Sequence, residues 1–321
     1  MKKVYNLCLN KKKEINSKMR ESGCNLCPRN CFVDREAGIP GYCGQTDKIY
    51  VARAALHMWE EPCISGKEGS GTVFFSGCPL RCIFCQNHQI ALGKEKNGEK
   101  IGKEVSISRL KDIFLELQEK GANNINLVTG THYIPQIAEA LVSAKAEGLV
   151  IPIVYNTSGY EKKDSLRLLE GLVDIYLPDM KYVSTELSKE YSNASDYFEV
   201  ASKAIEEMVH QVGEPVFDER GMIQKGVIVR HLVLPGSTKD SKDVLKYLWE
   251  TYGNKIYISL MNQYTPMEQI KNHPLLSRKI TKREYQKVVD YALSLGWENG
   301  FIQEGETAKE SFIPSFYGEG V

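Results

Sequence analysis

The chain has 321 residues, 42% of them hydrophobic and 26% charged, fractions that are ordinary for a globular protein. Its 41 Lys and Arg residues balance its 41 Asp and Glu residues, so the overall charge predicts neither a nucleic-acid partner nor binding to a membrane surface. No segment approaches the roughly 20 apolar residues that span a bilayer, and residues 1–15 lack the apolar run of a secretory signal, so we expect a cytoplasmic protein.

Residues 1–68 are rich in cysteine, glycine and proline, and we predict that they form a small metal-binding module. All nine cysteines of the chain lie between Cys8 and Cys85, whereas a packing role would scatter them. In a reducing compartment such clusters bind metals more often than they form disulfides. Four of them have the spacing of a closed ligand set: Cys24, Cys27, Cys31 and Cys43. The pattern slightly favours a structural metal such as zinc over an auxiliary Fe–S cluster, and unliganded thiols are a third interpretation. The role of Cys63 is open.

Residues 69–275 alternate short runs of Val, Ile, Tyr and Phe with helical patterns. The strand-like runs are residues 72–76, 124–128, 150–155, 173–177, 226–234 and 255–260. Helical patterns cover residues 106–118, 135–146, 165–172, 185–210 and 239–249. This alternation predicts an α/β protein with a parallel sheet, either an open doubly wound sheet or, as we prefer, a partial (β/α)6 barrel. Residues 276–321 are expected to add a helix and a tail.

The strongest signal in the chain is a C-x3-C-x2-C triplet formed by Cys78, Cys82 and Cys85, directly after the first of these strands. Three thiolates within eight residues can hold one [4Fe–4S] cube and leave one iron without a protein ligand. An open position on a metal is where substrate chemistry occurs. The loop also follows the carboxyl end of a strand, where parallel barrels carry active sites. A zinc site completed by His88 and three core cysteines are the alternatives.

This triplet, preceded by Val-Phe-Phe, resembles the signature of the radical S-adenosylmethionine (SAM) superfamily. The resemblance implies a (β/α)6-type partial barrel and a [4Fe–4S] cluster on the three cysteines, with SAM chelated by the fourth iron. It implies that the reduced cluster cleaves SAM to methionine and a 5′-deoxyadenosyl radical. It also places Phe84 beside the adenine of SAM.

Longer segments resemble the glycyl-radical-enzyme activases, such as the pyruvate formate-lyase activating enzymes, and a less characterised branch of their homologues. The matching segments are residues 69–82, 156–160, 177–181 and 230–236. By this resemblance Lys181 contacts the SAM carboxylate and Arg230 approaches SAM from the fifth strand. Asp179 and Thr157 are then candidates to hold a monovalent cation near the methionine part of SAM. Lysine and arginine at strand ends are suited to orienting anionic groups.

Two segments depart from the activase pattern. The usual Gly-Gly-Glu after the second strand is replaced by Thr129, Gly130 and Thr131, whose carbonyls and hydroxyls are candidates to bind the SAM ammonium. Asn156 stands where the activases have aspartate, and a neutral amide is a weaker cation ligand. His132 is either a neighbour of the cluster or a structural residue.

Together these observations predict an anaerobic radical SAM enzyme that abstracts hydrogen from a substrate. The resemblance favours a glycyl residue of a partner enzyme as the target and a flavodoxin or ferredoxin as the electron donor. Modification of a small molecule or peptide is the first alternative. A non-catalytic Fe–S or zinc protein that transfers electrons or scaffolds a partner is the second.

Overall fold

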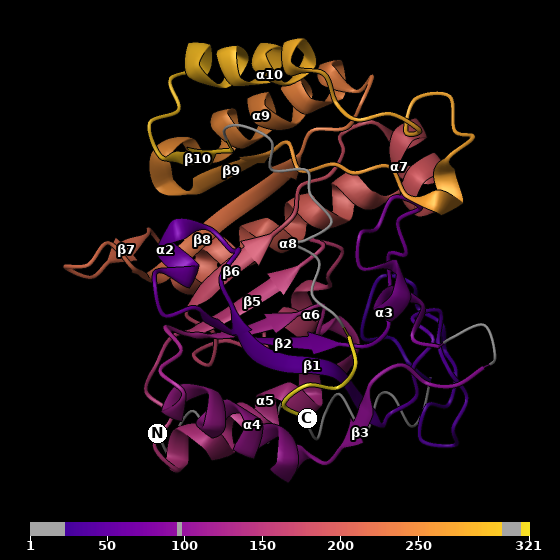
Figure 1. Ribbon diagram of the computed structural model, residues 1–321, viewed down its shortest axis with the longest axis vertical. Coiled ribbons are helices and arrows are strands. Elements are labelled where there is room, and N and C mark those ends of the chain that lie inside the picture. The colour runs from indigo at the N-terminus through magenta and orange to yellow at the C-terminus, as the bar shows by residue number, and fades with distance from the viewer. Residues whose placement is uncertain (1–22, 95–97, 304–315) are drawn as a thin grey trace.

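The computed structural model describes residues 23–94, 98–303 and 316–321, and one twisted sheet runs through its centre (Figure 1). The strands are β1 (Ile49–His57), β2 (Ser70–Phe75), β3 (Lys103–Val105), β4 (Ile125–Val128), β5 (Ile153–Thr157), β6 (Ile175–Pro178), β7 (Val216–Phe217), β8 (Ile223–Leu232), β9 (Tyr257–Met261) and β10 (Gly300–Ile302). Their order is β10-β9-β8-β6-β5-β4-β2-β1-β3, and β7 pairs with β8.

The strands from β2 to β10 along this order pair in parallel, whereas β1 and β3 add an antiparallel edge. The sheet does not close, because β10 and β3 lie at opposite ends of the order. The predicted α/β class with a partial barrel is therefore confirmed. All six predicted strands are present, as β2, β4, β5, β6, β8 and β9.

Helices surround the sheet, and most of them cover its outer face (Figure 1). They are α2 (Pro62–Ser65), α3 (His88–Leu92), α4 (Ile107–Glu119), α5 (Ile134–Ala146), α6 (Lys163–Leu166), α7 (Thr185–Ser192), α8 (Tyr197–Val212), α9 (Thr238–Tyr252) and α10 (Lys282–Leu295). Helix α4 illustrates why they form there: Ser106 accepts a hydrogen bond from the Arg109 amide at its start, and one apolar face is buried. Short 3₁₀ turns lie at Thr131–Tyr133, Gly253–Lys255 and Glu268–Ile270.

Two helix predictions were wrong in extent. The helix expected over residues 165–172 is the four-residue α6, and the chain continues from it in turns. The single helix expected over residues 185–210 is interrupted, because Asn193 adopts a left-handed conformation (φ 48°) and ends α7. Asparagine tolerates that conformation better than other non-glycine residues. The chain then re-enters a helix at Tyr197, the start of α8.

Helix α2 fills part of the concave face of the sheet (Figure 1). Its residues Cys63 and Ile64 form a separate apolar cluster with side chains from β5, β6 and β8, namely Val154, Ile175, Leu177, Ile223 and Ile228. Cys63 is 6% exposed and serves there as a packing residue. This short helix places the preceding residues at the floor of the cavity described below.

The last described segment, residues 316–321, returns to the antiparallel edge of the sheet near β1 (Figure 1). The Gly318 amide donates to the Ala52 carbonyl at 3.0 Å, and the Ala54 amide donates to the Glu319 carbonyl at 2.9 Å. Helix α10 packs on α9 at the other end of the molecule. In the described ranges no helix is both long and apolar enough to cross a membrane.

Candidate functional site

A cavity of about 250 Å³ lies at the carboxyl ends of the parallel strands. Residues at or just after the ends of β2, β4, β5, β6, β8 and β9 line it. The predicted site residues that line it are Cys78, Cys82, Phe84, Cys85, Thr129, Asn156, Thr157, Asp179, Lys181 and Arg230. We call this the first cavity.

The three cysteines of the C-x3-C-x2-C loop all line the first cavity. We call this loop, residues 78–85, the cluster loop. The Leu80 amide donates a hydrogen bond to Cys78 Sγ at 3.4 Å, and the Ser192 hydroxyl donates to Cys82 Sγ at 3.1 Å. Burial raises the pKa of Cys78 to about 11 and also raises the pKa values of Cys82 and Cys85, the last one further because the other two thiols lie close to it. Metal binding deprotonates such thiols, so a three-thiolate iron–sulfur cluster fits this donor set.

Lys181 supplies a positive charge beside these thiols. Its Nζ lies 2.6 Å from Asp179 Oδ2. Burial alone lowers the pKa of Lys181, but the Asp179 carboxylate and the Cys82 thiol more than offset this effect, and the net pKa is raised. The ammonium is therefore charged at neutral pH and lies between the cluster loop and the end of β6, where it can attract an anionic group of a ligand.

Phe84 is part of the cluster loop, and its side chain is buried, with 5% of the residue exposed. Its ring makes edge contacts with Tyr191 and Tyr264 at centroid distances of 6.4 Å and 6.3 Å. Such edge-to-face packing fixes the orientation of the ring, which also lines the first cavity.

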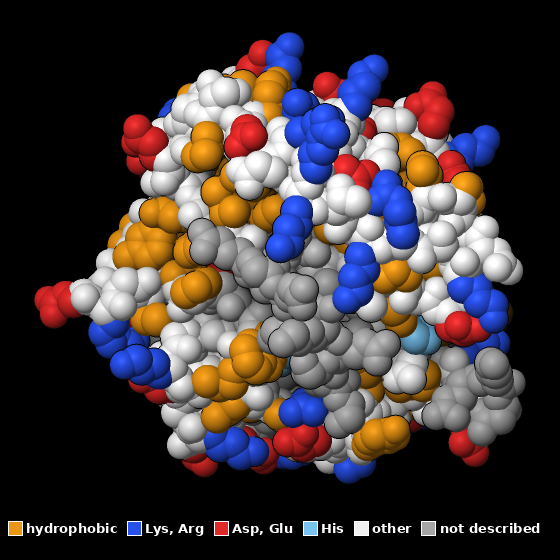
Figure 2. Space-filling view, turned by 45° about the horizontal axis from the view of Figure 1, so that its top comes forward, with side chains coloured by type: hydrophobic (Ala, Val, Ile, Leu, Met, Phe, Trp, Pro, Cys, Tyr) orange, Lys and Arg blue, Asp and Glu red, His pale blue; other side chains and the backbone are white. Residues whose placement is uncertain are grey.

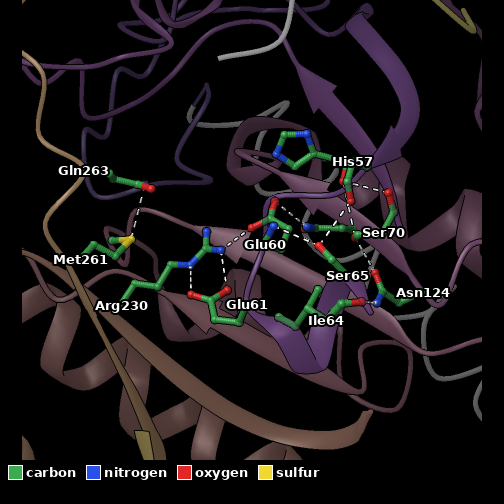
Figure 3. A network of polar contacts seen from close by, with 12 residues as sticks. His57, Glu60, Glu61, Ile64, Ser65, Ser70, Asn124, Arg230, Met261 and Gln263 are labelled. Atoms are coloured by element: carbon green, nitrogen blue, oxygen red, sulfur yellow. Dashed lines mark hydrogen bonds and ion pairs between the residues drawn. The ribbon is translucent and has the colours of Figure 1, made fainter. Parts of the chain in front are cut away.

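Arg230 on β8 is held by two glutamates that precede α2 (Figure 3). Its Nε lies 2.8 Å from Glu61 Oε1 and its Nη2 lies 2.6 Å from Glu61 Oε2, while Nη2 also bonds to Glu60. Burial works to raise the pKa of Glu61, but the Arg230 charge dominates and the pKa is lowered. The sequence did not reveal this pair, because the residues lie 169 positions apart and the family resemblance assigned Arg230 to SAM.

Thr129 directly follows β4 and has a left-handed backbone (φ 59°), which is strained for a β-branched residue. Its amide donates to the Asn156 carbonyl at 2.9 Å, so it links the ends of β4 and β5 at the cavity wall. Gly130 does not line the cavity. A Cβ on Gly130 would lie 2.5 Å from Ile137 Cδ1, so its lack of a side chain serves helix packing.

Thr131 also points away from the first cavity, toward the buried carboxylate of Glu161. Glu161 Oε1 accepts hydrogen bonds from the hydroxyls of Thr131 (2.6 Å), Thr157 and Tyr155 (3.2 Å). This network, which the sequence did not reveal, joins the segment after β4, which carries Thr129, to the end of β5, which carries Asn156. His132 is structural: its Nε2 pairs with the Ser76 carbonyl at 2.7 Å, and burial lowers its pKa to about 3.

Glu161→Gln is expected to flatten the pH dependence of stability. Burial raises the pKa of Glu161 to about 7 despite its hydroxyl donors, so the folded state retains a proton that the unfolded state loses near pH 4.5. Because the folded state binds this proton more tightly, the free energy of unfolding falls as pH rises from about 4.5 to 7, by roughly 3 kcal/mol. Glutamine lacks this titration. Urea unfolding of both proteins at pH 5 and pH 8 measures the difference, and parallel pH profiles would contradict it.

The four N-terminal cysteines lie together in a segment without helix or strand, residues 23–48. A Cβ on Gly41 would lie 3.5 Å from Cys31 Sγ and 3.7 Å from Cys43 Sγ. Burial, with a smaller contribution from the other three thiols, raises the pKa of Cys27 to about 12. Within the described ranges, however, no three His, Cys, Asp or Glu side chains already converge on one metal ion.

Arg29 fastens this segment to the cluster loop. Its guanidinium donates to the carbonyls of Pro79 (2.7 Å), Leu80 (3.4 Å), Ser192 (3.0 Å) and Asn193. The same group lies over the rings of Tyr42 and Tyr160, at 4.2 Å and 5.1 Å from their centroids. One side chain thus joins the cysteine-rich segment, the cluster loop and the end of α7.

Arg29→Ala is expected to lower the free energy of unfolding by about 3 kcal/mol, because several carbonyls lose a charged donor. Arg29→Lys is not expected to restore stability, since an ammonium cannot reach the carbonyls in the fork geometry of a guanidinium. Urea unfolding measures both variants. Arg220→Ala is the matched control, because Arg220 pairs with Asp218 on an exposed turn, and it should cost about 0.5 kcal/mol or less. Equal losses in Arg29→Ala and Arg220→Ala would contradict the prediction.

Comparison with known proteins identifies the family of the chain. A sequence profile of the Radical SAM superfamily matches residues 72–248. An uncharacterized protein of Methanocaldococcus jannaschii is 27% identical over 272 residues, which cover 84% of this chain and 74% of that protein.

Three solved structures are similar. Methylornithine synthase has a TM-score of 0.49 and 13% identity, covering 75% of this chain and 63% of its own. SuiB of Streptococcus suis bound to SAM has a TM-score of 0.46 and 15% identity, and the match covers 71% of this chain and 48% of SuiB. A domain of a pyruvate-formate lyase-activating enzyme from Bacteroides vulgatus has a TM-score of 0.38 and 13% identity, and the match covers 54% of this chain and 92% of that domain. The chain thus spans less than two thirds of the length of methylornithine synthase and of SuiB.

The superfamily profile covers more than half of the chain, and its match begins in β2 and includes the whole C-x3-C-x2-C loop. The chain belongs to the radical SAM superfamily.

Proposed function

We propose that the chain cleaves SAM reductively at a [4Fe–4S] cluster bound by Cys78, Cys82 and Cys85, and that the product radical abstracts hydrogen from a substrate. The observation that carries this proposal is the common cavity of the three thiols, Lys181 and the residues at the strand ends. When bound, the reduced cluster supplies one electron, which splits SAM into methionine and a 5′-deoxyadenosyl radical; this radical takes a hydrogen atom and leaves 5′-deoxyadenosine. The electron comes from a donor of the flavodoxin or ferredoxin class.

In this proposal the residues of the chain bind and orient SAM. Lys181 pairs with the SAM carboxylate, which its raised pKa and its position beside the thiols support. Phe84 contacts the adenine. Thr129 and Asn156 offer polar groups to the methionine end, and Asp179 holds the Lys181 ammonium in place. Arg230 reaches the opposite wall of the cavity from β8.

We also propose a metal at the four N-terminal cysteines, either structural zinc or an auxiliary Fe–S cluster. The proximity of the Cys31 and Cys43 sulfurs supports it, as does the lack of regular structure that would otherwise stabilise residues 23–48. Elemental analysis with Mössbauer spectroscopy of purified protein distinguishes zinc from iron, and protein with neither metal would contradict the proposal.

Two substrate classes are proposed for the radical. The activase-like segments support a glycyl residue of a partner enzyme. A second cavity of about 360 Å³ beside the first supports a small molecule or a peptide side chain, because its size is in the range of ligand pockets.

Anaerobic reconstitution with iron and sulfide, followed by SAM and dithionite, tests the function. We expect 5′-deoxyadenosine to form slowly even without substrate. Protein that binds iron but forms none under these conditions would favour the non-catalytic Fe–S or zinc alternative. Incubation with candidate partner enzymes, monitored by EPR for a glycyl radical doublet, tests the activase version separately.

A further inference from the structure

The second cavity adjoins the first and shares five lining residues with it: Trp59, Glu60, Arg230, Met261 and Gln263. Its other walls come from α2, from β9 and from the edge strand β10 with Gln303 after it. Arg230 and Glu60, whose contact is drawn in Figure 3, line both cavities. A molecule in the second cavity would therefore lie next to a SAM molecule in the first.

The charged groups of the second cavity do not balance. Glu60 and Glu61 are its only acidic lining residues in the described ranges, and Arg230 is its only basic one. Burial opposes the charge on Arg230, but the two carboxylates outweigh this effect and raise its pKa. Both glutamate side chains are less than a tenth exposed. Glu60 Oε1 also accepts a hydrogen bond from the Asn126 amide at 3.0 Å, but this donor is neutral, so one net negative charge is left largely out of water. Burying an uncompensated charge is costly unless a ligand of opposite sign supplies the missing partner.

The other walls suit an organic cation with an aliphatic stem. Trp59 lies at the mouth with 61% of its surface exposed, and indole faces attract ammonium and guanidinium groups. Gln303 Nε2 donates to Gln263 Oε1 at 3.1 Å, so two amides are held side by side on the wall. Ile302 also lines the cavity and is partly exposed. Figure 2 shows hydrophobic side chains gathered on the left side of that view of the molecule. The cavity thus pairs an acidic floor with an aromatic and apolar rim.

We propose that the second cavity binds the substrate of the reaction through an ammonium or guanidinium group carried on a short aliphatic chain. The cation meets Glu60 and Glu61, and the chain lies along Trp59 and the edge of β10. This inference rests on the proposed radical SAM function, because it makes the second cavity the substrate site of that reaction. A lysine or arginine side chain of a peptide and a free amine share this chemistry.

Equilibrium dialysis of reconstituted, SAM-loaded enzyme tests the proposal with three probes. N-acetyl-lysine methylamide represents a peptide side chain, 1,4-diaminobutane represents a free amine, and N-acetyl-norleucine methylamide is the neutral match of the first. We expect the lysine probe to bind at least about tenfold more tightly than the norleucine probe. Binding of diaminobutane as tightly as the lysine probe would identify a free amine as the source, and weaker binding would identify a peptide. Equal affinity of the lysine and norleucine probes, or no saturable binding of either cation up to about 10 mM, would overturn the proposal.

Glu60→Gln provides the second arm, because it removes the excess charge and keeps the shape of the side chain. We expect it to weaken binding of the lysine probe by about fivefold to tenfold and to leave the norleucine probe unaffected. Asp112→Asn on α4 is the control, since its side chain is partly exposed and lines neither cavity, and it makes the same change in net charge; an equal effect there would overturn the proposal. If Glu60→Gln does not fold, the comparison of probes on the unaltered enzyme still decides.

Formation of 5′-deoxyadenosine in the same samples separates this inference from the proposed function. Its absence from every sample would overturn the radical chemistry, whereas its presence without any preference for cationic probes would overturn only the assignment of the second cavity.

Discussion

Replacing Cys82 with alanine is expected to abolish 5′-deoxyadenosine formation and to lower the iron content by about four atoms per chain. A cube with three thiolate ligands cannot be held stably by two, and the radical chemistry belongs to the cofactor, so no partial activity is expected. Product analysis by liquid chromatography and iron analysis of anaerobically purified protein measure the two effects. A variant that retains its iron and still forms product would contradict the proposed ligand set.

Cys63→Ala is the matched control for this experiment. Cys63 is also a buried thiol, but it packs against β5, β6 and β8 in the cluster formed by α2, and it lines neither cavity. Its loss removes only one sulfur atom from an apolar environment, which should cost about 1 kcal/mol of stability. Iron content and product formation per folded protein should match those of the unaltered chain.

Replacing Arg230 with alanine is expected to lower the free energy of unfolding by about 3–5 kcal/mol, because two buried carboxylates lose their cation. Glu60 and Glu61 then face each other without compensation, at side-chain exposures of 7% and 5%. Urea unfolding of the apoprotein measures the loss. The substitution should also weaken SAM binding, since Arg230 lines the first cavity.

The triple variant Arg230→Ala, Glu60→Gln and Glu61→Gln should recover most of the lost stability, because its buried groups are neutral. Arg278→Ala controls for the loss of any bidentate arginine: Arg278 pairs with Glu284 at the surface, and its removal should cost about 1 kcal/mol or less. If the single and triple variants were equally unstable, the carboxylates would not be the cause.

The sequence predicted six of the parallel strands well because most of them are short, buried runs of branched and aromatic residues. The burial of every residue in β2, β4 and β6 illustrates this pattern. The edge strands β3 and β10, and β1 next to β3, were not predicted. β1 mixes Ala and Arg with its apolar residues, and β3 and β10 have only three residues each, which is too short for a period to be recognised.

The candidate site could be predicted only in part, because motifs identify residues and not their partners. The cysteine triplet and Lys181 stood out by spacing and by resemblance. Thr131 was assigned to the SAM side, whereas its hydroxyl bonds to the buried Glu161, which lies 30 positions away in sequence. Local patterns carry no information about contacts of this kind, which depend on how the strands assemble.

The interruption at Asn193 has a consequence for anyone who wishes to engineer a hardier protein. Joining α7 and α8 into one continuous helix is an attractive design, since it would add backbone hydrogen bonds and remove the left-handed conformation of Asn193. The kink, however, is what brings the Ser192 hydroxyl to Cys82 and the Ser192 and Asn193 carbonyls to Arg29. Heat resistance gained in this way would come with faster loss of inorganic sulfide and iron, so screening such designs by melting temperature alone would select the wrong molecules.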